Sequence, residues 1–234
     1  MAASGPLTES RSAVAPAWHT GVVLFGLIVL SLAVAHFMDL PFVGTYGRGA
    51  GYGWIALLEW AIVGFIHNGV TRCGTTLRDL IGGKWSRAVM VLRDVAVSLA
   101  FLVIAFSISQ ALAYLLKAEP NQAVRNIIPH SSSEAVLFLI LTLTAGFCEE
   151  VIYRGYLRRQ FTALTQSAAG GILLQAITFG AGHTYQGWKF VLIVSMLGIM
   201  FGLLAHWRHS LRPGMAAHFL QDGIGGLLAW KFLS

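Results

Sequence analysis

Two adjacent glutamates, Glu149 and Glu150, stand at the end of a long apolar run, and Arg154 follows four residues after Glu150. On an α-helix, Glu150 and Arg154 lie one turn apart on the same face and can form an ion pair. Glu149 points about 100° away from Glu150, because a helix turns once per 3.6 residues. Its carboxylate is therefore available as a general base for water. The alternative is an ion pair that only anchors a helix end at the membrane interface.

Two further polar pairs have the spacing of one helical turn. Phe179 and His183 follow the apolar run GGILLQAIT, and His218 and Asp222 are the first and last residues of the stretch HFLQD. A carboxylate hydrogen-bonded to one imidazole nitrogen fixes the tautomer of the ring and thereby the role of its other nitrogen. Each pair alone is also compatible with an interfacial side chain or a polar contact between two helices.

The three groups together would form a water-activating site if their helices meet. Glu149 would act as the base, and His183 and His218 would orient the water or stabilise an oxyanion. The same three side chains could hold a divalent metal, since two histidines and a carboxylate are common ligands of zinc. Ionisable groups inside a bilayer cost about 2.5–3.5 kcal/mol each on insertion scales, which favours a functional role.

The composition of the chain is that of a polytopic membrane protein. Hydrophobic residues make up 56% of the sequence and charged residues 11%, against about 25% charged residues in soluble domains. The apolar runs are long and lack the period-two alternation of strands, so we expect an all-α bundle of about seven spanning helices. The predicted spans are 18–37, 52–71, 88–116, 134–157, 169–185, 188–206 and 212–231.

One membrane domain with three parts is expected. Residues 1–17 are small and polar and predict a flexible tail, 18–133 carry the N-terminal transmembrane helices, and 134–234 form a catalytic core of four helices. The stretch Ala33-Val34-Ala35 resembles a signal-peptidase site, so the first helix is either retained or cleaved. We expect a retained helix, because the segment is long and begins a polytopic chain.

The distribution of the 16 Lys and Arg residues predicts a cytoplasmic N-terminus, because basic residues gather in cytoplasmic loops. Seven spans place eleven of the 16 on the inner side and five on the outer side. Glu149 and His218 then fall in the cytoplasmic half, and His183 lies about 20 Å along its helix, so that helix must tilt or begin later. We expect a multi-pass protein of the plasma or inner membrane with its active site toward the cytoplasm. Nucleic acid is excluded as a partner, since aromatic-interleaved basic runs are absent.

The polar motifs resemble those of a known family of intramembrane proteases. The stretch EEVIYRGYL is similar to the EExxxR motif of the CAAX protease and bacteriocin-processing (CPBP) family, which includes the type II CAAX prenyl endopeptidases. The FxxxH motif of that family matches Phe179–His183, and its HxxxN or HxxxD motif matches His218–Asp222. The resemblance covers about residues 134–230, and residues 1–133 match only in being helical.

The resemblance implies an endopeptidase that hydrolyses a peptide bond of a membrane-associated protein or peptide within the lipid bilayer. It implies that Glu149 activates the water with the help of His183, that His218 and Asp222 position the substrate and oxyanion, and that Glu150 and Arg154 organise the helix end. Asp222 stands where many members have asparagine. An ionised aspartate cannot donate a hydrogen bond, which favours a metal-binding or histidine-orienting role. Catalysis by glutamate-activated water alone and catalysis assisted by zinc both stay open.

Two other function classes remain to be tested. A catalytically silent scaffold or immunity protein on the same fold would tolerate loss of Glu149. A proton or cation transporter would use the acids and histidines as binding sites, although no internal repeat accompanies them. Glu59 and His67, eight residues apart in the second predicted helix, could share a face and contact substrate, or have a packing role.

Overall fold

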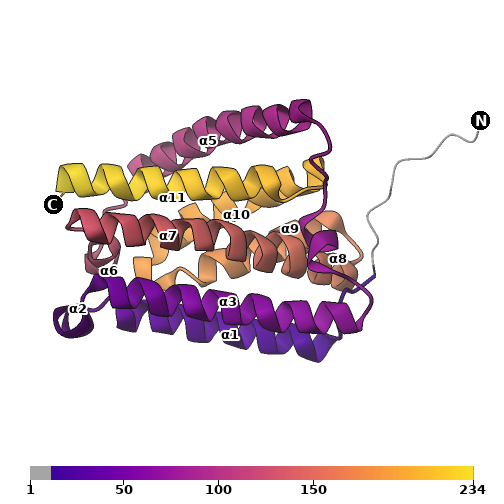
Figure 1. The fold of residues 1–234 in the computed structure, drawn as a ribbon, viewed down its shortest axis with the longest axis horizontal. Coiled ribbons are helices and arrows are strands. Elements are labelled where there is room, and N and C mark those ends of the chain that lie inside the picture. Colours follow the sequence, from indigo (N-terminus) through magenta and orange to yellow (C-terminus); the bar gives the residue numbers. More distant parts are fainter. Residues whose placement is uncertain (1–11, 234) are drawn as a thin grey trace, which may run out of the picture.

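The computed structural model describes residues 12–233, which form an all-α bundle, as the sequence predicted (Figure 1). Its helices are α1 (Ala17–Phe37), α2 (Leu40–Tyr46), α3 (Arg48–Arg72), α4 (Leu77–Ile81), α5 (Ala88–Leu116), α6 (Gln122–Ile127), α7 (Ser132–Glu149), the π-helix η1 (Glu150–Leu157), α8 (Arg158–Thr165), α9 (Ala168–Ala181), the 3₁₀-helix η2 (Thr184–Gln186), α10 (Trp188–Arg208) and α11 (Arg212–Leu233). Within the described residues, the only β-type pairing is one isolated bridge between Gly82 and Ser210.

Five of the described helices are long and apolar enough to cross a membrane. They are α1, α3, α5, the continuous helix formed by α7, η1 and α8, and α10. The predicted span 169–185 corresponds to α9, which ends at Ala181 and has 14 residues, fewer than the roughly 20 that a crossing needs. The predicted span 212–231 corresponds to α11, whose 22 residues include Asp222 and Arg212. The prediction of seven spans thus includes two helices that differ from the other five. Helix α9 is shorter than they are, and α11 is more polar.

The bundle has two ends of different character, because successive long helices run in opposite directions. We call one end the loop end, where α2, α6 and η2 lie, and the other the basic end, where α4 and α8 lie. Figure 1 shows α2 and α6 at one end of the bundle and α8 at the other. At the loop end, the Asn126 side chain donates to the Met38 carbonyl at 2.7 Å, and Asn121 donates to that of Tyr185 at 2.8 Å.

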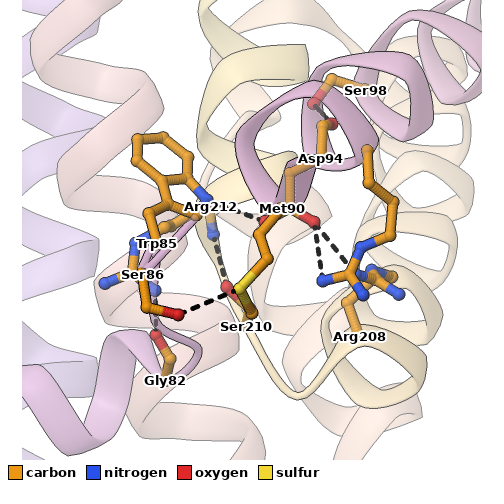
Figure 2. Close-up of polar contacts among 10 residues, drawn as sticks. Gly82, Trp85, Ser86, Met90, Asp94, Ser98, Arg208, Ser210 and Arg212 are labelled. Carbon is orange, nitrogen blue, oxygen red and sulfur yellow. Dashed lines mark hydrogen bonds and ion pairs between the residues drawn. The ribbon is translucent and has the colours of Figure 1, made fainter. Parts of the chain in front are cut away.

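The basic end is held together by a cluster of polar side chains around Asp94 (Figure 2). The carboxylate of Asp94 accepts hydrogen bonds from Trp85 Nε1 and Arg208 Nη2, each at 2.9 Å. Ser98 donates to the carbonyl of Pro213 at 2.9 Å, which ties α5 to the start of α11. These contacts fix the loop after α4 and the α10–α11 turn to the first turns of α5.

The start of the described chain also packs on the basic end. The backbone amides of Val14 and Ala15 donate to Gln160 Oε1 at 2.7 and 3.2 Å. His19 is buried, and its Nδ1 lies 2.7 Å from the hydroxyl oxygen of Tyr156. Residues 1–11 of the predicted flexible tail lie outside the described residues.

A glycine lets the two helices that carry the predicted motifs approach each other closely. A Cβ atom at Gly146 of α7 would lie 3.0 Å from the backbone nitrogen of Phe219 and 3.1 Å from the Met215 carbonyl oxygen in α11. These distances are tighter than ordinary Cβ contacts, so a side chain at this position would push the two backbones apart by a few tenths of an ångström. Glycine at position 146 thereby brings Glu149, three residues later, beside His218.

Candidate active site

Both glutamates of the EExxxR motif reach the same histidine. Glu149 is the last residue of α7, and Glu150 is the first residue of the π-helix η1. Glu150 Oε1 lies 3.1 Å from Nδ1 of His218, and Glu149 Oε2 lies 3.6 Å from its Nε2. The sequence predicted a regular helix with the two acids pointing apart. The wider π-turn differs from that expectation, and π-helical segments are frequent at functional sites.

Glu150 also forms the expected ion pair with Arg154. The distance between Glu150 Oε1 and Arg154 Nη1 is 3.1 Å, and both side chains are completely buried. Removing two ions from water is costly, so further contacts must offset the desolvation. The guanidinium carbon of Arg154 lies 4.2 Å from the ring centre of Phe179 and 4.9 Å from that of Phe201. The phenylalanine of the FxxxH motif thus provides a cation–π contact to the arginine of the first motif.

His218 is held by carboxyl groups on both of its nitrogens. Its Nε2 lies 3.4 Å from Asp222 Oδ2, so the pair expected from the helical spacing is formed. The Asp222 side chain is 38% exposed, whereas that of His218 is 5% exposed. With Nδ1 at Glu150 and Nε2 at Glu149 and Asp222, the imidazole ring has a fixed orientation. This arrangement suits the histidine-orienting role for Asp222.

His183 approaches the site from a third segment. The sequence prediction included His183 in a helix over 169–185, but α9 ends at Ala181 and His183 follows it with backbone angles of φ −107° and ψ 21°. Its Nδ1 lies 2.8 Å from the carbonyl oxygen of Phe179, and its ring packs against the Phe179 ring at 4.8 Å between centres. Because a carbonyl only accepts hydrogen bonds, Nδ1 carries a proton, and in the neutral ring Nε2 is the acceptor.

These residues line one cavity of about 480 Å³, a size typical of ligand sites. Glu149, His183, His218 and Asp222 all contribute to its wall, and most of the remaining lining is apolar. The cavity extends from these residues to α6 and the preceding loop, so it occupies the loop-end half of the bundle. Its exposed lining residues are Phe106 and Gln110 of α5 and Gly225 of α11.

The depth of the site differs from the sequence expectation. Glu149 is 17 residues from Ser132 and 16 from Thr165 in one continuous helix, which places it about 25 Å from each end. The sequence placed Glu149 and His218 in the cytoplasmic half, corresponding to the basic end. The cavity instead runs from the middle of the bundle toward the loop end, because α9 is short and His183 follows its loop-end terminus.

The donor set does not have the arrangement of a metal centre. Among the described residues, no group of three or more His, Cys, Asp and Glu side chains could hold a metal ion. Glu149, His183 and His218, the predicted ligands, share the cavity wall. Nδ1 of His218 is engaged by Glu150 and Nδ1 of His183 by a backbone carbonyl, which leaves only the Nε2 atom of each ring for a ligand. Because the described residues contain no group of three metal-binding side chains, no catalytic step below is assigned to zinc.

Glu59 and His67 do not share a face. Glu59 is 2% exposed and lines the cavity, whereas His67 is exposed and its carbonyl accepts from the Thr71 hydroxyl at 2.6 Å. Eight residues on an α-helix leave two positions about 80° apart, which separates them here. Glu59 is instead part of the buried face of α3, with Tyr52, Ile55, Val63, Ile66 and Val70. An acid within that apolar periodicity is the sequence signal that identifies it.

Comparisons with known proteins agree with the motif resemblance. Residues 131–224 match a family model described as type II CAAX prenyl endopeptidase Rce1-like. A stretch of 99 residues is 27% identical to the uncharacterized protein YpbD of Bacillus subtilis, covering 42% of this chain and 44% of that protein. The chain thus spans less than half the length of this relative. No solved structure matches the chain. With its apolar helices, the chain is a multi-pass membrane protein, and the match of residues 131–224 to the Rce1-like family model is consistent with the CPBP family.

Proposed function

We propose that this chain is an intramembrane endopeptidase that hydrolyses a peptide bond of a membrane-associated protein or peptide. The observation that carries the proposal is the position of Glu149. Its partly exposed carboxylate lines the cavity 3.6 Å from Nε2 of His218, whose other nitrogen is held by the buried Glu150. The similarity of residues 131–224 to a family named for endopeptidases supports the same reaction class.

The geometry suits general-base catalysis by a carboxylate. Glu149 would take a proton from a water molecule as the water oxygen attacks the peptide carbonyl carbon. An N–H of His218 would stabilise the oxyanion that forms, because the ring is already oriented by Glu150 and Asp222. The Nε2 atom of His183 would accept a hydrogen bond from the same water. The leaving nitrogen also needs a proton, which this set of groups does not by itself assign.

We propose that substrate enters from the non-cytoplasmic side. Ten of the 15 Lys and Arg residues that the structure describes fall at the basic end or in the half next to it, which the positive-inside rule assigns to the cytoplasm. The cavity extends toward the opposite end, with its exposed lining at Phe106, Gln110 and Gly225. This proposal differs from the cytoplasmic access expected from the sequence, and the two are alternatives for experiment.

Cysteine labelling on intact cells tests the side of access. In a Cys73→Ser background, a membrane-impermeant maleimide is expected to label Lys117→Cys at the loop end without lysis. Lys84→Cys at the basic end should react only after lysis. Gln110→Cys, at the cavity mouth, should then react from the same side as Lys117→Cys. The reverse pattern would restore cytoplasmic access.

Comparison of protein termini tests the activity itself. Membranes of cells that express wild type, Glu149→Ala or the matched control Glu134→Ala are analysed for new N- and C-termini. We expect termini that wild type and the control share and that Glu149→Ala lacks. If all three proteins are present and folded and their termini agree, the chain is a silent scaffold. Repeating the wild-type measurement with a chelator tests the metal-assisted alternative, which predicts loss of cleavage.

A further inference from the structure

Glu59 is an acid in the middle of an apolar helix face, outside the part of the chain that matches the family. It lies on α3, packs against α7, and is 2% exposed. Its Oε2 atom is buried and has no hydrogen-bond partner among the described residues. A buried carboxyl group without a partner costs several kcal/mol if it is ionised. An apolar residue would fill the same position without this cost, so packing does not explain the acid.

Other titratable groups lie near Glu59, but no described Lys, Arg or His forms an ion pair with its carboxyl group. The groups that interact electrostatically with Glu59 are Glu149 and Cys148 of α7, Tyr153 of η1, Tyr185 of η2, and His218 and Asp222 of α11. His218 is the only one of these that can become cationic, and it is already in contact with three carboxyl groups. The charged members of the set are therefore mainly acids.

A charge count indicates which carboxyl group would keep its proton. Glu150 has Arg154 at 3.1 Å, and Glu149 and Asp222 each have His218 within 3.6 Å. Glu59 has no cationic side chain within that distance, and the charges that act on it are those of His218 and of the two acids Glu149 and Asp222. Like charges close together in a low-dielectric site cannot all be ionised, as in carboxylate pairs that share one proton.

We infer that Glu59 is the general acid of the proposed reaction, a protonated carboxyl that lines the same cavity as the base Glu149. The inference rests on the proposed function and supplies the proton that the other groups leave unassigned. It also gives α3, which lies outside the matched domain, a direct part in the chemistry. The active site would then consist of two carboxyl groups with opposite protonation states.

The step balances with water and the peptide alone. Glu149 takes a proton from water as the C–O bond forms, and the carbonyl electrons move to the oxygen beside His218. When this oxyanion collapses, the C–N bond breaks and its electron pair passes to nitrogen. The nitrogen takes the proton of Glu59, giving an amine and a carboxylic acid. Transfer of the proton from Glu149 to Glu59 then restores both groups.

The test compares Glu59→Gln with wild type on an internally quenched peptide that spans a bond found by the terminus comparison. Loss of a general acid is expected to lower kcat by about 100-fold or more, with KM changed less than about threefold. The decline of wild-type kcat at alkaline pH should disappear in the variant. Infrared spectra should lose one C=O band of a protonated carboxyl group, which a merely structural role would not predict for position 59.

Three controls keep the inference separate from the proposed function. Glu134→Gln makes the same change outside the cavity and should leave kcat unchanged. Glu59→Leu should unfold at a temperature equal to or above that of wild type and be as inactive as Glu59→Gln, which separates folding from chemistry. If Glu59→Gln keeps its kcat and pH profile while Glu149→Gln is inactive, the role of Glu59 is wrong and the proposed function stands. If Glu149→Gln also cleaves, the proposed function is wrong.

Discussion

Buried acids occur in two regions of this molecule, and they differ in how their carboxyl groups are satisfied. At the basic end, Asp94 accepts from Trp85 and Arg208 at 2.9 Å each, and Arg93 lies at 3.5 Å (Figure 2). The cavity wall holds three acids, Glu59, Glu149 and Asp222, and Oε2 of Glu59 has no hydrogen-bond partner among the described residues. Native structures rarely leave buried polar atoms unsatisfied, so exceptions need an explanation. The contrast is consistent with a structural role for the first cluster and with the proposed catalytic role for the second.

The largest effect on stability is expected from Glu150→Ala, because this change breaks a completely buried ion pair. It leaves the completely buried Arg154 without its carboxylate, and breaking a buried pair in this way costs about 3–5 kcal/mol. We expect a markedly lower unfolding temperature in detergent and poor accumulation in membranes. Glu150→Gln keeps an acceptor and should lose less. A Glu150→Ala protein as stable as wild type would mean that the two phenylalanine rings suffice to hold Arg154.

A smaller loss is expected from Asp94→Ala, which tests the structural side of the contrast. The change removes the acceptor of Trp85 and Arg208. A hydrogen bond to a charged group contributes about 1.5–3 kcal/mol, but Trp85 is 51% exposed and Arg208 14%, so water can replace part of what is lost and the total stays below that of Glu150→Ala. Thermal unfolding should show the loss, while kcat per folded molecule stays unchanged. Asp94→Asn should recover part of the stability. A fall in kcat at equal folded fraction would contradict a purely structural role.

The helices could be predicted from the sequence, because their apolar runs are long and each corresponds to a helix in the structure. The Glu150–Arg154 and His218–Asp222 pairs could also be predicted, since both depend only on helical spacing. The π-turn at Glu150 could not, because nothing in the stretch EEVIYR distinguishes it from a regular helix. The direction of the cavity depends on where α9 ends. The end at Ala181 could not be predicted, because the stretch FGAGH can either continue a helix or terminate it.

The place of Glu59 depends on packing between segments far apart in the chain. Glu59 and Glu149 are 90 positions apart, and only the packing of α3 against α7 brings them to one cavity. Asp94 illustrates the same limit of sequence-based prediction at the basic end. Near the start of a predicted span it is typical of an interfacial acid, and only the α10–α11 turn supplies Arg208. Local spacing predicts contacts within a helix, whereas contacts between helices need the fold.

Phe179→Leu tests whether the ring of the FxxxH motif has the electrostatic role assigned to it. Leucine keeps most of the apolar volume but removes the aromatic ring that lies nearest to the Arg154 guanidinium among the described contacts. A desolvated cation–π contact contributes about 2 kcal/mol, so we expect a stability loss of about 1–2 kcal/mol. Phe101→Leu is the matched control, because Phe101 packs on the ring of Phe201 at 4.7 Å but no cation lies over it among the described contacts. Equal losses in both variants would show that packing alone explains the phenylalanine.

The smallest effect is expected at Asp79, an exposed acid at the basic end with satisfied hydrogen bonds. The Thr76 hydroxyl donates to Asp79 Oδ2 at 2.6 Å and the Thr76 amide donates to it at 2.9 Å. These bonds lower the pKa of Asp79 below its usual value of 3.8. A lowered pKa contributes stability that is present above the unfolded-state pKa and lost as the pH falls through the folded-state pKa.

Asp79→Asn should therefore lower the unfolding midpoint slightly at neutral pH, by no more than about 2 °C for a chain of this size. The difference from wild type should shrink as the pH falls toward 3, because protonation removes the same charge from the wild type. Thermal unfolding of both proteins in detergent at neutral pH and at about pH 3 measures this difference. A gap that widens on acidification would mean that Asp79 is stabilised in its protonated form. Asp79 and Asp94, the two hydrogen-bonded acids discussed at the basic end, would then not both be stabilised as carboxylates.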